Sequence, residues 1–329
     1  MSQAKIINRP KIVLRAAFNA DINEPTWRRR GYNVVQGLKE LGWNIDWQLN
    51  VRDTDADIVI LLRSSDRQEV DFLHKQNKVL IFDINDLLVF DDIFVIEDVI
   101  RNVDYVVTCS HWMARRFADI NPNVICVPDS LEEEFFTSKP AVLPEEPIIF
   151  SWHGTNDNLP YFMYIADVLK QIASEYNILV KFITTERNSI GVLNSDIIAQ
   201  FPFPGLFVEW KRDKFVSDLC NSHAGLIPLH ITDFCNCKAS HKAISFMALG
   251  LPCIASDVPP YRDVIQHGYN GFLAYTDDEW YQCLKQIITS PTLRQTIGEN
   301  GREMAKFFTI DRIVNLWDRL LTYICSNKF

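Results

Sequence analysis

Short apolar runs recur along the first half of the chain, and helical patterns separate several of them. The runs occupy residues 11–17, 43–49, 57–63, 78–82, 103–109 and 123–127. Residues 26–41 have the spacing of an amphipathic helix, and Ser110 is placed to cap another. Apolar runs that alternate with helices are typical of a parallel sheet covered on both faces. The pattern therefore predicts an α/β domain in this half.

The second half repeats the alternation. Its apolar runs lie at residues 147–152, 178–184, 206–210, 224–229 and 252–255, and helices are predicted at residues 213–220, 237–249, 261–267 and 310–325. A capping box of Thr276 and Glu279, and the pair Ser290-Pro291, mark two further helix starts. This pattern predicts a second parallel α/β domain.

The boundary between the two domains is predicted from a proline-rich segment. Residues 137–147 read TSKPAVLPEEP and contain three prolines without periodicity, which is typical of a linker. We therefore predict domains at residues 1–140 and 147–308 and a separate C-terminal helix at residues 309–329. A chain of 329 residues is long enough for two domains that each bury a core.

The composition of the chain limits the partners and the cellular location that the protein is expected to have. The formal net charge of −9 argues against a nucleic-acid partner. The start of the chain lacks the apolar core of a signal peptide, and no stretch approaches the ~20 apolar residues of a membrane-spanning helix. The eight cysteines are scattered and are interpreted as reduced thiols. These features predict a cytoplasmic protein, and a peripheral membrane contact is left open.

The clearest chemistry lies in the predicted helix at residues 237–249. Lys238, Lys242 and Ser245 are spaced to share one face, close to the N-terminus of the helix. Two ammonium groups beside the positive end of a helix dipole suit a phosphate group. The alternative is an ordinary solvated face. The position directly after a buried strand favours a site.

Two Lys residues with three residues between them, followed by MALGLPCIASDVPPYRDVI and GYNGFL, resemble the donor half of GT-B glycosyltransferases, most closely the retaining family four (group 1). The resemblance is strong over residues 224–273 and weaker over most of the chain. It implies an α/β fold of two Rossmann-like domains that face each other across a cleft. It also implies that the C-terminal helix packs back on the first domain.

The resemblance implies a transfer of sugar from a nucleotide-diphosphate sugar to an unknown sugar, lipid or protein acceptor. Lys238 and Lys242 would neutralise the leaving diphosphate, and Gly154 would approach the phosphates through its backbone. The implied donor-binding residues are His153, Gly154, Thr155, His241, Ser245, Asp257, Val258 and Pro259. The implied acceptor-side residues are Arg63, Asp83 and Asp86. No metal and no other cofactor is required if lysines carry the positive charge.

One feature departs from the family pattern. The helix of that family carries two Glu residues separated by seven positions, and Cys237 and Ser245 occupy those positions here. A catalytically silent nucleotide-sugar-binding or scaffold protein of the same fold is therefore the alternative to an enzyme.

Three local alternatives also stay open. Asp83 and Asp86 follow a strand, where they either face the acceptor or cap a helix and form a turn. Arg28, Arg29 and Arg30 either bind an anion or, as we favour, pair with nearby acidic residues or face solvent. A zinc site is disfavoured, because no second pair of closely spaced cysteines supports the cluster of Cys235, Cys237, His241 and the nearby His223 and His230.

Overall fold

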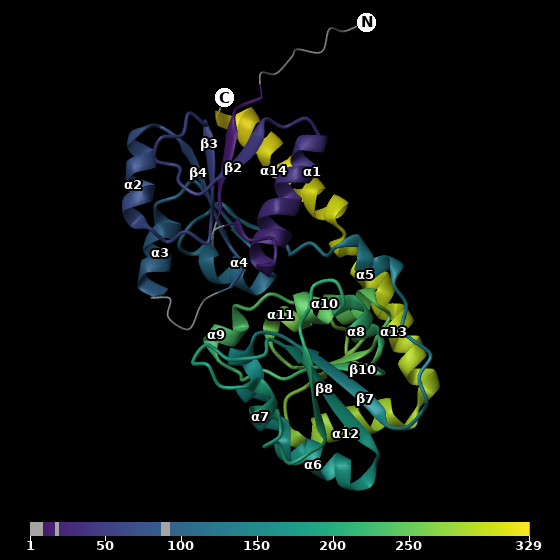
Figure 1. The fold of residues 1–329 in the computed structure, drawn as a ribbon. Helices are drawn as coiled ribbons and strands as arrows, with labels where there is room; N and C mark the ends of the chain where they lie inside the picture. The colour runs from purple at the N-terminus through teal and green to yellow at the C-terminus, as the bar shows by residue number, and fades with distance from the viewer. Residues whose placement is uncertain (1–8, 17–19, 87–92, 329) are drawn as a thin grey trace, which may run out of the picture. The chain divides into compact units, whose positions relative to one another are not determined.

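The computed structural model describes residues 9–16, 20–86 and 93–328, and the chain forms two compact units (Figure 1). Unit 1 comprises Met1–Ser130, Cys237–Ala239 and Phe308–Phe329, and unit 2 comprises Leu131–Asn236 and Ser240–Phe307. The last residue of the first predicted strand, residue 17, lies outside the described residues. Each unit is described by itself below.

Unit 1 is built on a six-stranded sheet in the order β2-β1-β3-β4-β5-β6, and every strand pair is parallel. The strands are β1 (Ile12–Arg15), β2 (Ile45–Gln48), β3 (Ile58–Leu62), β4 (Val79–Ile84), β5 (Tyr105–Thr108) and β6 (Val124–Cys126). All residues of β3, β4 and β5 are buried, which explains their continuous apolar runs. The prediction of a parallel sheet is confirmed.

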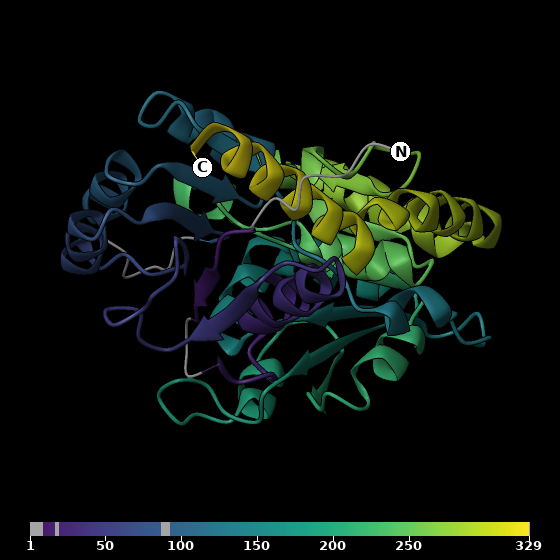
Figure 2. The same cartoon turned by 90° about the horizontal axis from the view of Figure 1, so that it is seen from above.

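The helices of unit 1 cover this sheet. They are η2 (Trp27–Tyr32), α1 (Asn33–Glu40), α2 (Arg67–Lys75), α3 (Ile93–Arg101), α4 (His111–Ala118) and α14 (Ile310–Lys328). α14 lies beside α1 (Figures 1 and 2), where Gly37 gives the Val314 side chain room to approach. The Ser110 hydroxyl accepts a hydrogen bond from the backbone of Met113 and caps α4, as predicted.

The helix predicted at residues 26–41 has two parts. Its first turns, η2, form a π-helix, and a regular α-helix follows. The buried Trp27 ring packs against Gly31, and a Cβ added to Gly31 would lie 2.1 Å from Trp27 Cε3. The wider π-helical turn therefore accommodates this large ring. The pattern of apolar positions in the sequence does not reveal such a turn.

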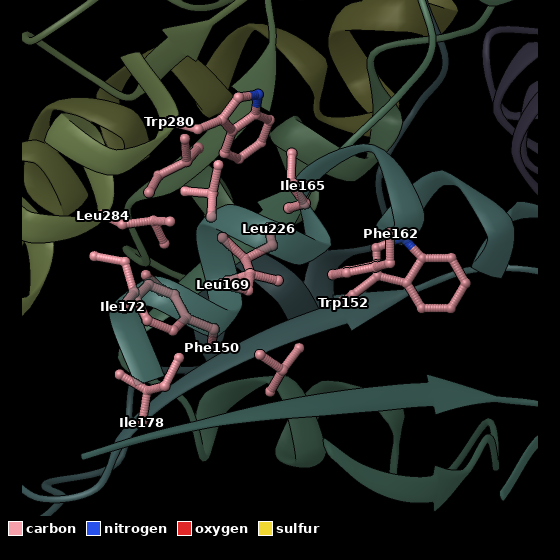
Figure 3. Packing of buried hydrophobic residues seen from close by; sticks show 14 of the residues in the cluster. Phe150, Trp152, Phe162, Ile165, Leu169, Ile172, Ile178, Leu226, Trp280 and Leu284 are labelled. Atoms are coloured by element: carbon pink, nitrogen blue, oxygen red, sulfur yellow. The ribbon is translucent and has the colours of Figure 1, made fainter. Parts of the chain in front are cut away.

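Unit 2 has a second six-stranded parallel sheet in the order β12-β11-β10-β7-β8-β9. The strands are β7 (Ile148–His153), β8 (Ile178–Thr184), β9 (Gly205–Glu209), β10 (Ala224–Ile227), β11 (Cys253–Ser256) and β12 (Phe272–Ala274). Figure 3 shows one layer of its core, in which Trp152 and Phe150 of β7 meet Phe162, Leu169 and Trp280 from the surrounding helices.

The helices of unit 2 are α5 (Glu133–Thr137), η3 (Asn156–Ile165), α6 (Ala166–Glu175), α7 (Asn194–Ile198), α8 (Phe215–Cys220), α9 (Asp233–Asn236), α10 (His241–Ala248), α11 (Pro259–Arg262), α12 (Asp277–Thr289) and α13 (Pro291–Ala305), and η4 (Lys306–Phe308) leads into α14. The predicted capping box of Thr276 and Glu279 begins α12, and Ser290-Pro291 begins α13. Both predictions of a helix start are confirmed.

The segment 137–147, which was predicted as the linker between the two domains, lies within unit 2. The chain passes from unit 1 to unit 2 between Ser130 and Leu131, so this segment belongs to unit 2. It is held there because Ala141 donates to the carbonyl of Cys220 at 2.9 Å and Arg294 pairs with Glu145. The prolines exclude regular structure, but side chains and carbonyls of the segment still bind the domain.

His223 fixes the same segment and makes stability depend on pH. Its Nδ1 accepts from the backbone N–H of Ile149 at 2.9 Å, and its Nε2 contacts the carbonyl oxygen of Pro144 at 3.0 Å. Both bonds form only when the ring is neutral with its proton on Nε2. Burial disfavours the imidazolium and lowers the pKa of His223.

We expect this stabilisation to be complete above the ordinary histidine pKa of about 6.5 and to be lost as the pH falls below it, because the unfolded chain then binds the extra proton. Urea unfolding of the native protein and of His223→Gln at pH 5.5 and 8 tests this. The difference in midpoint between the two proteins should shrink at the lower pH. A difference that does not change with pH would contradict the role of the neutral ring.

Candidate functional site

The turn after β7 forms the centre of the candidate site in unit 2. It consists of His153, Gly154 and Thr155, at the carboxyl edge of the sheet where ligands of open α/β domains bind. The Gly154 carbonyl accepts from the Thr184 hydroxyl at 2.8 Å, which ties the turn to β8. A Cβ added at Gly154 would lie 2.8 Å from both Lys242 Nζ and Trp152 Cζ2. Only glycine therefore fits between these two side chains.

Lys242 reaches this turn from the first turn of α10. The side chain is 9% exposed, and its Nζ lies 4.9 Å from the centroid of the Trp152 ring. An ammonium group at this distance from a ring face is attracted by the ring quadrupole. The structure thus brings together Gly154 and Lys242, two residues that sequence analysis singled out for the phosphates.

Lys238 is not on the same helix face as Lys242, so this part of the prediction is wrong. α10 begins at His241 rather than Cys237, and the residues between α9 and α10 form turns and bends. Asn236, at the end of α9, and Ser240, just before α10, favour helix ends and turns over helix interiors. Cys237–Ala239 groups with unit 1, where Lys238 Nζ lies 3.7 Å from Asp86 Oδ2.

Ser245 and Cys237, which occupy the positions of the two family carboxylates, are both fully buried. The Ser245 hydroxyl donates to the carbonyl oxygen of His241 at 2.8 Å, one turn earlier in α10. The single donor of the hydroxyl is therefore used within the helix, and the predicted contact of Ser245 with the donor substrate has no support from this geometry.

Ser245→Ala should leave the affinity for a nucleoside diphosphate within about twofold, because the hydroxyl bonds its own helix rather than a ligand. The free energy of unfolding should change by no more than about 1 kcal/mol, the net value of one neutral hydrogen bond. Isothermal titration calorimetry with one nucleotide on both proteins checks this. A loss of tenfold or more in affinity would place the hydroxyl in the binding site.

His153 and His241 lie beside the same turn. The His153 ring is 5% exposed, and its centroid lies 5.0 Å from that of Phe215, 5.5 Å from that of Phe246 and 6.4 Å from that of His241. Thr155 is exposed and accepts from Asn158 Nδ2 at 2.7 Å. These three predicted residues therefore surround the site of Gly154 and Lys242.

Asp257, Val258 and Pro259 form a separate turn after β11. The Asp257 carboxylate binds Arg262 through two contacts of 2.6 and 2.9 Å, and these hydrogen bonds raise the pKa of Arg262. The Val258 side chain is fully buried, its N–H donates to the carbonyl of Ser256, and Pro259 begins α11. The Asp257 carboxylate and the Val258 N–H are thus engaged in and beside this turn.

Asp83, a predicted acceptor-side residue in unit 1, is fully buried and binds Arg30. Arg30 Nε donates to both carboxylate oxygens at 3.0 and 3.1 Å, and Arg30 Nη1 donates to Asp129 at 2.9 Å and to the carbonyl of Val127 at 2.8 Å. Burial alone would lower the pKa of Arg30, but the two carboxylates raise it, so the guanidinium is charged. Asp83 therefore stabilises unit 1 instead of facing an acceptor.

The expectation that the three arginines face solvent is wrong, and Arg30 pairs with Asp83 and Asp129, which are acidic residues distant in the sequence. Arg28, Arg29 and Arg30 are 6%, 3% and 2% exposed. Arg28 donates to the carbonyls of Ile22 and Asn23, and the carbonyl of Arg29 accepts from Ser130. Asp129 was not among the predicted site residues; the signal that could have found it is a charged residue that lies three positions after the end of a strand, here β6.

Arg63 and Asp86, the other acceptor-side candidates, are half-buried residues that follow β3 and β4. Arg63 has a φ of +53°, a backbone conformation that residues other than glycine rarely adopt. Its N–H donates to the carbonyl of Asp83 at 2.9 Å. Such backbone strain is often found at functional sites. Neighbouring Ser64 donates to buried Glu69, which in turn binds Arg15.

The cysteine and histidine cluster that was weighed as a zinc site does not converge on one point. Cys235 is buried with its Sγ 3.6 Å from Tyr161 Oη, while the His230 ring packs between Tyr161 and Tyr164. Over residues 9–16, 20–86 and 93–328, no group of three or more His, Cys, Asp or Glu residues could hold a metal ion. A search of the same residues for a helix long and apolar enough to cross a membrane also found none.

The two six-stranded parallel units, with the last helix returned to the first, have the fold of GT-B glycosyltransferases. A sucrose-phosphate synthase from Thermosynechococcus elongatus superposes with a TM-score of 0.75 and 13% identity, covering 97% of this chain and all of that one. HepE from Anabaena, in complex with UDP and glucose, gives a TM-score of 0.71 at 10% identity and covers 95% of this chain and all of HepE. The predicted fold is confirmed.

Within this class, residues 240–304 match the family model for glycosyl transferases group 1. An uncharacterized glycosyltransferase of Methanocaldococcus jannaschii is 34% identical over 74 residues, which are 22% of this chain and 21% of that relative. The chain thus spans about a fifth of the curated relative it matches. The resemblance to the group 1 family is confirmed for the segment that contains Lys242, α10 and α11.

Proposed function

We propose that the protein is a glycosyltransferase that moves a sugar from a nucleotide-diphosphate sugar to an acceptor bound by unit 1, with retention of configuration. The observation that carries the proposal is the Lys242 ammonium beside Gly154, at the carboxyl edge of a parallel sheet and within the group 1 segment. A glycine that permits close approach, a cation and a helix N-terminus together suit a diphosphate.

The chemistry follows from where charge develops. As the glycosidic bond breaks, negative charge grows on the departing diphosphate, so a cation fixed beside it stabilises the transition state more than the ground state. Lys242 supplies that cation, and the first N–H groups of α10 add the positive end of the helix dipole. Lys238 is proposed as a second cation near the donor. No residue is assigned as a base.

The proposal extends to the class of donor and to the cellular location of the protein. The solved structure of HepE contains UDP and glucose, and this supports uridine-diphosphate sugars as the first donors to test. All eight cysteines have free thiols, which is usual in a reducing compartment and supports a cytoplasmic location. The acceptor is a sugar, a lipid or a protein.

The proposal is tested by measuring the release of free nucleoside diphosphate from a panel of nucleotide sugars. Cell extract supplies the acceptor. Sustained release above the rate without extract supports an enzyme. Binding of a nucleotide sugar without release would support the silent binding protein, which Cys237 and Ser245 favour because neither supplies a carboxylate. A thermal-shift screen selects the donor, since a ligand at 100 times its Kd stabilises by about 2.7 kcal/mol.

A further inference from the structure

Trp152 is the penultimate residue of β7, and surrounding rings fix its indole. The side chain is 1% exposed, and its ring centroid lies 5.8 Å from that of Phe162 and 6.1 Å from that of Phe182. Figure 3 shows Trp152 beside Phe162 at one end of the core layer. A buried indole held by two other rings has little freedom to move, so it is a rigid surface for whatever packs on it.

Lys242 and Gly154 meet this indole at one point. Lys242 Nζ lies 4.9 Å from the ring centroid, while Nζ and Trp152 Cζ2 each lie 2.8 Å from the position of a Cβ at Gly154. The ring, the ammonium group and the backbone of the turn after β7 are thus in mutual contact. The attraction of a cation to an aromatic ring is larger when both are shielded from water, as they are here.

A ring positions an ammonium group differently from hydrogen-bond acceptors. Lys181, another buried lysine of unit 2, donates to the carbonyls of Asp218 and Asn221 at 2.5 and 2.6 Å. Its ammonium group thus binds carbonyl oxygens at the C-terminal end of α8. A ring face attracts the charge without accepting its N–H groups as a carbonyl oxygen does. An ammonium group has three N–H donors, and phosphate oxygens accept such charged donors strongly.

We propose that Trp152 is a positioning residue that holds the Lys242 ammonium over Gly154, ready to bind the diphosphate of the donor. The first half of this inference, that Trp152 positions Lys242, does not depend on the proposed function. The second half, that Lys242 is thereby ready to bind the diphosphate, rests on the proposed function. Trp152 itself need not touch the substrate, because it acts through Lys242. The proposed site thereby extends into the core of unit 2, to a residue that packs against Phe162 and Phe182.

The position of Lys242 can be measured without substrate, by NMR of protein labelled with ¹³C at the lysine ε-carbons. Lys242→Arg identifies the Lys242 signal by its disappearance. A ring current from Trp152 should shift the ε-CH₂ protons upfield, and Trp152→Leu should remove that shift. Phe162→Leu is the matched control, because it shortens a buried aromatic residue of the same core that contacts the indole rather than the ammonium.

Affinity for UDP, measured by calorimetry, tests the second half. Trp152→Leu should weaken UDP binding by about 3-fold to 30-fold, the range of a cation–π contact, with a smaller effect for Phe162→Leu. Trp152→Phe should recover part of the loss, since it restores a ring. Fluorinated tryptophans at position 152, which have a less negative ring face but nearly the same shape, should weaken binding stepwise with each added fluorine.

Each outcome decides one half of the inference. An ε-CH₂ signal that Trp152→Leu leaves in place would overturn the contact itself. A lost ring-current shift with UDP affinity equal to that of Phe162→Leu would overturn the link to the diphosphate. If the native protein binds neither UDP nor another nucleoside diphosphate, the proposed function fails and the diphosphate half fails with it, while the NMR result still decides whether Trp152 positions Lys242.

Discussion

Arg30→Met is expected to lower the free energy of unfolding of unit 1 by about 3–5 kcal/mol, the cost of breaking a buried ion pair from one side. Asp83 and Asp129 would keep their carboxylates at 0% and 6% exposure without the guanidinium that binds both. The carbonyl of Val127 would also lose its donor. Urea denaturation followed by circular dichroism measures the loss as a lower midpoint of the transition that belongs to unit 1.

Arg67→Met is the matched control. Arg67 also binds two aspartates, Asp71 and Asp98, but its side chain is 35% exposed, and exposed ion pairs typically contribute less than about 1 kcal/mol. Combining Arg30→Met with Asp83→Leu and Asp129→Leu should recover stability, because no buried charge then remains unpaired. Equal effects of Arg30→Met and Arg67→Met would show that burial of the Arg30 pair carries no special cost.

The sheets of both units could be predicted from the sequence because buried parallel strands are continuous apolar runs. β8 has the predicted bounds, residues 178–184, and the other strands lie within a few residues of their predicted positions, except β12, which was not predicted. Helix starts with a local chemical signal, such as Thr276 with Glu279, were also predicted correctly. In each of these cases the information lies within one turn or one strand of the residue concerned.

The errors concern interactions between residues distant in sequence. Three consecutive arginines look like a solvated surface unless it is known that Asp83 and Asp129, 53 and 99 positions away, bind Arg30. The start of α10 was predicted too early, because Cys237–Ala239 groups with unit 1 and is not part of the helix. The contact between Trp152 and Lys242 joins two elements 90 residues apart, and no local pattern indicates it.

Lys242→Ala is expected to reduce kcat/KM for the donor by about 10-fold to 150-fold while the protein stays folded. A charge-assisted hydrogen bond contributes about 1.5–3 kcal/mol, and a bond that strengthens as the diphosphate departs appears in the rate. Gly154→Ala should act in the same direction, because its methyl group would occupy the space 2.8 Å from Lys242 Nζ and displace it. Steady-state kinetics with the selected donor measures both variants.

The control for Lys242→Ala is Lys285→Ala, because Lys285 is also a lysine of unit 2 that lies over an aromatic ring, with its Nζ 5.8 Å from the Tyr281 centroid. Lys285 belongs to α12 and is exposed, so its removal should leave kcat/KM unchanged. Lys242→Arg keeps the charge but not the compact ammonium group, and it should recover only part of the rate. If Lys242→Ala folds and retains full kcat/KM, the ammonium beside Gly154 does not bind the leaving diphosphate, and the silent binding protein becomes the better description.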